Sequence, residues 1–310
     1  MTVTSDLIPS FSKVHTHAFS LDGFYGKLID FVDSLLSDFP GGKNISVYFA
    51  KRAQHEPSMQ QDLMCLLVYK ALGGQLALNT MPLAAVWALN LAASHFLDEA
   101  QDNNRFDMVN ESVLALGAAN VAISRLDTDH DTLRDILDAV GRVTALGANA
   151  QNDELRNGSI WSESEYFRNV AGKAAAIIAS GVWMGARLAI DDAQTLKLLK
   201  EFGLALGMAN QISDDCYDLA TDLAQGTYTL PVIKGLAMKS HPDHKTLTQL
   251  TSKPLLQGNE IQAIMNILTN MGTINASRRV VRAYQVQAAA VFKIIPGLEA
   301  YFANYVVPKS

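Results

Sequence analysis

Apolar residues recur along most of this chain at spacings of three and four, the period of an amphipathic α-helix. The clearest case lies between residues 78 and 97, where the apolar positions fall on one helical face. Alternation of apolar and polar residues, which would predict strands, is nearly absent. The pattern predicts an all-α protein, with helices at about residues 22–36, 107–126, 131–156, 191–218, 229–240, 258–271 and 275–304.

Capping residues predict where several helices begin and end. Thr80 followed by Pro82 predicts a helix start, and Gly73 predicts the end of the preceding helix. Capping boxes of the form Ser-x-x-Gln and Ser-x-x-Glu begin at Ser58 and Ser162. The second box is expected to open a long helix that includes a lysine at position 173.

The same long helix contains two glycines four residues apart, Gly181 and Gly185. Glycines at this spacing allow a neighbouring helix to pack closely, or allow a kink. No internal repeat, low-complexity tract or linker divides the chain, so we expect a single domain over residues 1–310.

Two apolar helices end in clusters of acids. In each cluster two acids stand four residues apart, which places them on one helical face. Like charges so placed repel, and buried acids are rare unless they are paired or bound to metal. We therefore expect an apolar pocket with Mg²⁺ ions at its mouth, where they would meet a phosphorylated substrate. The acids are Asp98, Glu99 and Asp102 in the first cluster, and Asp214, Asp215 and Asp218 in the second.

Composition narrows the class of protein. The chain has 310 residues, 49% of them hydrophobic, which is enough for one large core. A net charge of −6 without a basic block makes a nucleic-acid partner unexpected. The two cysteines, Cys65 and Cys216, lie in apolar helical settings and favour a reducing compartment. We expect no signal peptide and no transmembrane segment, and therefore a cytoplasmic protein.

Further motifs accompany the acids. Asp214 to Asp218 form a complete Asp-Asp-x-x-Asp motif, and the first cluster differs from it only by a Glu at position 99. In this arrangement the chain resembles the polyprenyl synthetases, which carry such a motif on each of two facing helices. The resemblance covers roughly residues 73–236. Its other matched positions are Gly203, Gly207, Gln211, Tyr166, Gly172-Lys173-Ala174 and Gly226-Thr227-Tyr228-Thr229-Leu230-Pro231.

This resemblance implies an isoprenoid synthase helical bundle around a deep apolar cavity, and a homodimer. It also implies that an allylic prenyl diphosphate loses its diphosphate, which the six acids would bind through Mg²⁺ and Lys173 would grip. Solvated helix faces are the competing interpretation of the first acidic cluster and of Lys173. The residues implied in catalysis are Asp98, Asp102, Lys173 and Asp214; those implied in substrate binding are Lys173, Gln151, Glu154, Gln211, Arg105, Ala93 and Ser94.

The chain departs from the family where chain-elongating members bind isopentenyl diphosphate. Leu91 stands at the position of a family His, and Arg105 is a single Arg where the family has a pair. Thr227 replaces a Lys, and the segment from Lys43 to Ser46 keeps the family's Lys but lacks its Arg. A second diphosphate would need these positive charges, so the isopentenyl half of the site is predicted to be degraded.

This pattern favours an enzyme that ionises one prenyl diphosphate and then cyclises it, or transfers it to an acceptor other than isopentenyl diphosphate. One alternative is ordinary elongation with substitute cations such as Lys51 and Arg52. Another is a catalytically silent subunit that packs against an active synthase.

Two small residues before the first acidic cluster bear on substrate length. The resemblance places chain-stopping bulky residues at the positions of Ala93 and Ser94, which are small here. We therefore expect a substrate of about fifteen carbons or longer, with Trp87, two turns earlier, as a candidate floor of the pocket.

Overall fold

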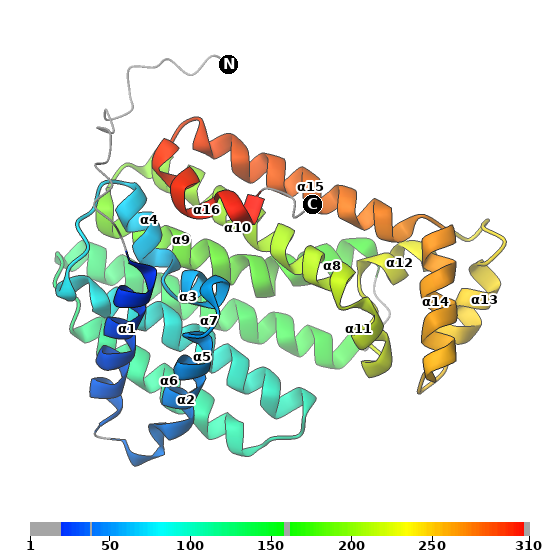
Figure 1. Cartoon of the computed structure of the whole chain (residues 1–310), viewed down its shortest axis with the longest axis horizontal. Helices are drawn as coiled ribbons and strands as arrows, with labels where there is room; N and C mark the ends of the chain where they lie inside the picture. The colour runs from blue at the N-terminus through cyan, green and yellow to red at the C-terminus, as the bar shows by residue number, and fades with distance from the viewer. Residues whose placement is uncertain (1–19, 38, 158–161, 307–310) are drawn as a thin grey trace. The chain divides into compact units, whose positions relative to one another are not determined.

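The computed structural model describes residues 20–37, 39–157 and 162–306, and within these ranges the chain is helical without a strand (Figure 1). The predicted all-α class is confirmed. The chain divides into two compact units. The first comprises the described residues up to Val140, with Gly181–Leu196 and Phe292–Tyr301, and the second comprises the other described residues. A single domain over residues 1–310 stays a prediction.

The first unit is built on α5 (Met81–Asp102) and α6 (Asp107–Ser124), which pack side by side along much of their lengths (Figure 1). α5 begins where the sequence predicts, since Thr80 precedes it and a Pro lies in its first turn. Its N-terminal half is almost wholly buried, as its apolar pattern requires. The earlier elements are α1 (Leu21–Leu36), η1 (Pro40–Gly42), α2 (Lys43–Arg52), α3 (Glu56–Asp62), α4 (Met64–Ala71) and η2 (Leu78–Thr80).

Helix α9 (Ala176–Ala189) packs against other helices of this unit at its two glycines. A Cβ atom on Gly185 would lie 2.0 Å from the carbonyl oxygen of Cys65, and one on Gly181 would lie 2.8 Å from the ring of Trp87. These contacts are too close for any side chain, so the predicted close helix packing is confirmed.

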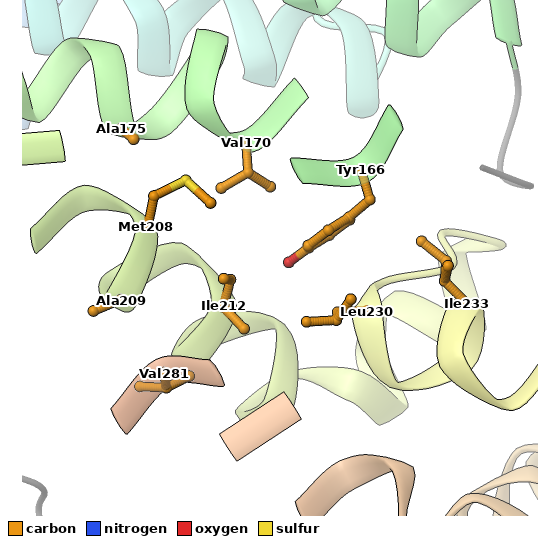
Figure 2. Close-up of a cluster of buried hydrophobic side chains, with 9 residues drawn as sticks. All are labelled: Tyr166, Val170, Ala175, Met208, Ala209, Ile212, Leu230, Ile233 and Val281. Atoms are coloured by element: carbon orange, nitrogen blue, oxygen red, sulfur yellow. The ribbon is translucent and has the colours of Figure 1, made fainter. Parts of the chain in front are cut away.

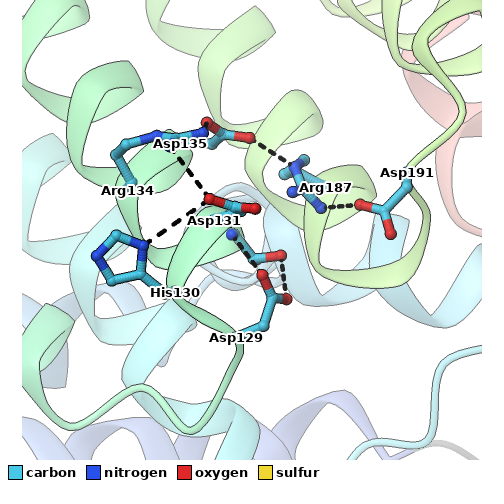
Figure 3. A network of polar contacts seen from close by, with 8 residues as sticks. Asp129, His130, Asp131, Arg134, Asp135, Arg187 and Asp191 are labelled. Atoms are coloured by element: carbon cyan, nitrogen blue, oxygen red, sulfur yellow. Dashed lines mark hydrogen bonds and ion pairs between the residues drawn. The ribbon is translucent and has the colours of Figure 1, made fainter.

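A polar network joins the C-terminal end of α9 to the first turns of α7 (His130–Asn157) (Figure 3). The Nε atom of Arg187 lies 2.9 Å from an oxygen of Asp135, and its guanidinium also pairs with Asp191. Asp129 precedes α7 and accepts a hydrogen bond from the backbone nitrogen of Thr132 at 2.9 Å. Hydrogen bonds from Thr132 lower the pKa of Asp129 to about 2.

The second unit has two apolar cores. One lies between α8 (Glu163–Val170), α10 (Ala193–Tyr217) and α15 (Thr273–Phe292), and it also includes the first turns of α12 (Leu230–Ala237). The other is centred on α11 (Leu219–Gln225), α13 (His244–Thr251) and α14 (Gly258–Asn270). The remaining elements of the chain are η3 (Ala171–Ala175), η4 (Pro296–Leu298) and α16 (Glu299–Val306).

Several predicted boundaries need correction. The capping box at Ser58 is wrong, because α3 already begins at Glu56 and Ser58 lies inside it. The box at Ser162 is confirmed: its hydroxyl accepts from the backbone of Glu165, whose carboxylate accepts from the Ser162 nitrogen at 2.8 Å. The helix predicted over 275–304 is interrupted around Pro296, where a short 3₁₀ turn forms.

One helical stretch of the described chain, Leu78–Gln101, is long and apolar enough to cross a membrane by length and composition alone. Its most apolar window is 72% buried inside the protein. Burial of that extent is typical of a core helix, so this stretch is weak support for a membrane span.

Candidate functional site

The acidic end of α10 presents its three carboxylates in two different environments. Asp214 and Asp218 are exposed, whereas Asp215 is buried, with 6% of its surface accessible. The backbone nitrogen of Asp218 donates to the carbonyl of Asp214 at 2.8 Å, so these two acids stand one helical turn apart. The predicted shared face of Asp214 and Asp218 is therefore present.

Asp215 is held by three neighbours from different elements. Tyr166 on α8 donates its hydroxyl to one carboxylate oxygen, and Gln211 on α10 donates to the other at 2.9 Å. The hydroxyl of Thr229, just before α12, donates to the Asp215 carbonyl at 3.3 Å. Burial, and then the charge of Asp215, raise the pKa of Tyr166 well above its usual range, so its hydroxyl stays protonated and donating.

The hydrophobic core beneath these acids fixes the same elements. Figure 2 shows the Tyr166 ring lying over α10 and α12, with Ile212 and Leu230 beside it. Val170 and Met208 continue the packing away from the acids. The apolar residues before Asp214 thus form a core, as the sequence predicts, and the acids lie at its edge.

Asp222, which the sequence analysis missed, joins this acidic cluster. It is half-buried on α11, and burial together with the charges of Asp215 and Asp218 raises its pKa to about 7. Asp214, Asp218 and Asp222 recur every four residues, and this spacing in the sequence could have revealed that Asp222 belongs to the cluster. The signal was overlooked because α11 was not predicted.

Lys173 lies half-buried in η3, a π-helical turn that interrupts the helix expected to continue from α8 into α9. Gln151 is buried on α7. The Asn169 side chain donates to the carbonyl of Ala150 at 2.9 Å, so α8 is tied to α7 next to Gln151. The side chain of Glu154 lies outside the described residues.

The first acidic cluster belongs to the other unit. Asp98 and Glu99 are half-buried in the last turns of α5, and the Asp102 side chain lies outside the described residues. Glu99 accepts a hydrogen bond from Asn103 at 3.1 Å. Since the two clusters lie in separate units, their meeting across a pocket stays a prediction.

Two of the cations considered for a second diphosphate, Arg52 and Arg105, have acidic partners. Arg105 forms two bonds with Asp107, at 3.0 and 2.7 Å. Arg52 forms two bonds of 2.7 Å with Asp62, which is fully buried and also accepts from the Tyr25 hydroxyl at 2.6 Å. Breaking such a pair would leave a buried carboxylate uncompensated, so Arg52 is held by the protein core.

The small residues before the first cluster occupy the buried side of α5. Ala93 is 3% exposed, and Ser94 is half-buried with its hydroxyl donating to the carbonyl of Asn90 at 3.1 Å. Trp87 is buried and donates from its indole nitrogen to the Gln61 carbonyl at 2.8 Å. This bond fixes the orientation of the Trp87 ring.

The carboxylates at the end of α10 suit a hard divalent cation. Asp214 and Asp218 are exposed, and the pKa of Asp222 is raised first by burial and then by the nearby charges of Asp215 and Asp218. Within the described ranges, no three His, Cys, Asp or Glu side chains are placed to hold a metal by themselves. Mg²⁺ needs fewer protein ligands than that, because waters and phosphate oxygens complete its shell.

One family model and several known proteins match parts of this sequence. A family model described as polyprenyl synthetase matches residues 100–268. A short chain isoprenyl diphosphate synthase of Methanothermobacter thermautotrophicus is 31% identical over 100 residues, which are 29% of this chain and 31% of that protein. The heptaprenyl diphosphate synthase component 2 of Bacillus subtilis is 29% identical over 142 residues, 42% of this chain and 40% of that protein. The matched stretches thus span less than half of these relatives.

Solved structures match over nearly the whole chain. The geranylgeranyl pyrophosphate synthetase of Pyrococcus horikoshii has a TM-score of 0.77 at 19% identity, with 94% of this chain and 97% of that one covered. A polyprenyl synthase of Caulobacter crescentus, complexed with calcium and isoprenyl diphosphate, has a TM-score of 0.75 at 17% identity, with 94% and 97% covered. At such identities the likeness shows a shared fold.

Proposed function

Since this chain belongs to the polyprenyl synthetase family, we propose that it is a prenyltransferase that lengthens an allylic prenyl diphosphate with release of diphosphate. The match over residues 100–268, which includes the acidic end of α10, carries this proposal. The curated relatives support elongation in preference to cyclisation, because the matched proteins are named as diphosphate synthases and a dimethylallyltranstransferase. Elongation therefore takes precedence over the cyclase reading that the sequence alone favoured.

Mg²⁺ is the proposed cofactor, and it would neutralise the negative charge of the departing diphosphate. Asp214 and Asp218 would hold it in one unit, and Asp98, Glu99 and Asp102 in the other. Asp215, expected from the resemblance to bind metal as well, is buried with both carboxylate oxygens bonded, so we propose that it holds Tyr166 and Gln211 in place. Gln211 would then act on the substrate only through Asp215.

Lys173 is proposed to bind the diphosphate as a point charge. Gln151 and Glu154 would lie near the reacting end of the prenyl chain. The small residues Ala93 and Ser94 of α5, together with apolar residues of the same helix, would line a dry space for a tail of about fifteen carbons or more, since water would quench a carbocation.

A second candidate is transfer to an acceptor without a diphosphate, or cyclisation. The observation in its favour is that Arg52 and Arg105 are already paired with Asp62 and Asp107. Arg52 is then not a substitute cation for isopentenyl diphosphate. A third reading, a silent subunit, has support in one relative that is named as a synthase component.

We further propose a cytoplasmic homodimer. Phe106, which directly precedes α6, is 74% exposed, and Val113 on α6 is 63% exposed, with Val109 between them. An apolar stripe of this kind suits contact with a second copy.

Product analysis distinguishes the candidates. The protein would be incubated with Mg²⁺ and prenyl diphosphates of increasing length, with and without isopentenyl diphosphate. A longer diphosphate formed only with isopentenyl diphosphate supports elongation. Hydrocarbon or alcohol formed without it indicates a cyclase, and no diphosphate release with any substrate would reject both enzymes.

The metal-binding acids can be tested directly. Asp98→Ala and Asp214→Ala should each lower turnover by orders of magnitude, because each removes a proposed metal ligand. Glu201→Ala, an exposed acid on the same helix as Asp214, is the matched control and should retain activity. Urea unfolding should show folded variants, and full activity in either folded variant would contradict the metal site.

A further inference from the structure

The π-helical turn η3 inserts one extra residue between α8 and α9. Its effect appears in the buried positions of this stretch, which are Tyr166, Val170, Ala175, Ile178 and Ala179. The step from Val170 to Ala175 is five residues, whereas the buried face of an unbroken α-helix would recur every three or four residues. The extra residue therefore brings Ala175 into the core and changes the direction in which Lys173 leaves the helix.

Helices α10 and α7 flank this turn, and the approach of α10 is the close one. On the side of α10, a Cβ atom on Gly207 would lie 2.5 Å from the Cα atom of Ala175 and 3.2 Å from Cβ of Ile178. On the side of α7, a Cβ atom on Gly172 would lie 3.6 Å from Cβ of Ala150. Only a glycine at position 207 permits the first approach, because the opposing atom is backbone and cannot rotate away.

We infer that Gly207 is a positioning residue for Lys173: by allowing α10 to meet the backbone of the π-turn, it fixes the register from which Lys173 projects. The inference rests on the proposed role of Lys173 in diphosphate binding. Its physical basis is that an isolated π-turn is less favourable than continuous α-helix and needs tertiary contacts to persist. Gly207 supplies such a contact two residues from Lys173.

A double-mutant cycle tests whether Gly207 acts through Lys173. The variants are Gly207→Ala, Lys173→Met and the double variant, with Gly141→Ala as control because a Cβ there meets nothing within 4 Å. Binding of inorganic pyrophosphate with Mg²⁺ would be measured by calorimetry, alongside KM and kcat. We expect each single variant to bind pyrophosphate at least about tenfold more weakly, and Gly141→Ala to bind like the wild type.

The double variant should bind no more weakly than Lys173→Met alone, because two residues that act as one unit are not additive. Additive losses would overturn the inference, since Gly207 would then act independently of Lys173. Wild-type binding by Lys173→Met would instead reject the proposed diphosphate role of Lys173. The two failures are therefore distinguishable.

A second variant covers the case in which Gly207→Ala does not fold. Deleting Ala174 removes the extra residue, so that α8 and α9 can join as one regular helix with both flanks in register. This variant should fold and still bind pyrophosphate at least about tenfold more weakly than the wild type. Wild-type affinity in the deletion variant would overturn the inference.

Discussion

At the scale of single residues, acids that look equivalent in the sequence have different surroundings. Asp214, Asp215 and Asp218 form one motif, yet only Asp215 is buried and bonded by Tyr166 and Gln211. The side on which each acid lies follows from helical geometry, but two of the hydrogen-bond partners of Asp215, Tyr166 on α8 and Thr229 just before α12, come from other elements. The role of Asp215 could therefore not be read from the motif.

The raised pKa of Asp222 predicts that the stability of the protein depends on pH. Its pKa is about 7 in the folded protein and 3.8 in an ordinary environment. Between these values the folded state keeps a proton that the unfolded state has released, so the unfolding free energy falls as pH rises from about 4 to 7. Asp222→Asn should raise the unfolding free energy at pH 8 by roughly 1–2 kcal/mol, a value reduced for solvent screening of a half-exposed group, and change it little at pH 4.

Urea unfolding at pH 4, 5 and 8 measures this effect. Asp129→Asn is a useful comparison, because the pKa of Asp129 is lowered to about 2 and titrates below this range. Its substitution should reduce stability to a similar extent at pH 5 and 8. An Asp222→Asn variant with the wild-type pH profile would show that the pKa of Asp222 is not raised in the folded protein.

Ala93 carries a prediction about substrate length. Ala93→Phe should shift preference toward shorter prenyl diphosphates, because the larger side chain would occupy the proposed tail space. Since Ala93 is buried, the thermal midpoint of the variant would be measured too, and some loss from overpacking is expected. Unchanged substrate preference in a folded variant would remove α5 from the tail site.

At the scale of elements, capping sequences predicted a helix start correctly only where no stronger start signal lay nearby. The capping box at Ser162 caps α8. The similar sequence at Ser58 caps no helix, because α3 already begins at Glu56, where a proline in the first turn favours a helix start. Short elements such as α11 escaped prediction because seven residues carry little periodicity. The π-turn at Lys173 was also missed, because its cause lies partly in the contact with Gly207.

A substitution at Gly185 tests how closely α9 packs in the first unit. Gly185→Ala would bring a methyl group against the Cys65 carbonyl, which cannot move without its helix. We expect the unfolding free energy to fall by about 1–3 kcal/mol. Gly117→Ala on α6 is the matched control, since nothing lies within 4 Å, and it should stabilise the protein by about 0.5–1 kcal/mol. Equal stability of the two variants, by urea unfolding, would contradict the close packing.

At the scale of the whole molecule, the prediction concerns assembly. Phe106→Asp combined with Val113→Asp should convert the proposed homodimer into a monomer, because charges would face each other across the α6 stripe. Sedimentation velocity of wild type and variant measures the change, and Asn120→Asp, also exposed on α6, serves as control. A wild-type monomer, or a variant that remains dimeric, would contradict the proposed interface.

The sequence by itself determined the all-α class, the family and the acidic ends of α5 and α10. These depend on the spacing of apolar and acidic residues within single helices, which the chain records directly. Tertiary structure decided which acid is buried, which arginines are already paired, and how Lys173 is presented. The burial of Asp215 and the presentation of Lys173 depend on atoms brought together from distant parts of the chain, such as Tyr166 against Asp215 and Gly207 against Ala175, and no local pattern specifies them. The pair of Arg52 with Asp62 forms between two neighbouring short helices, α2 and α3.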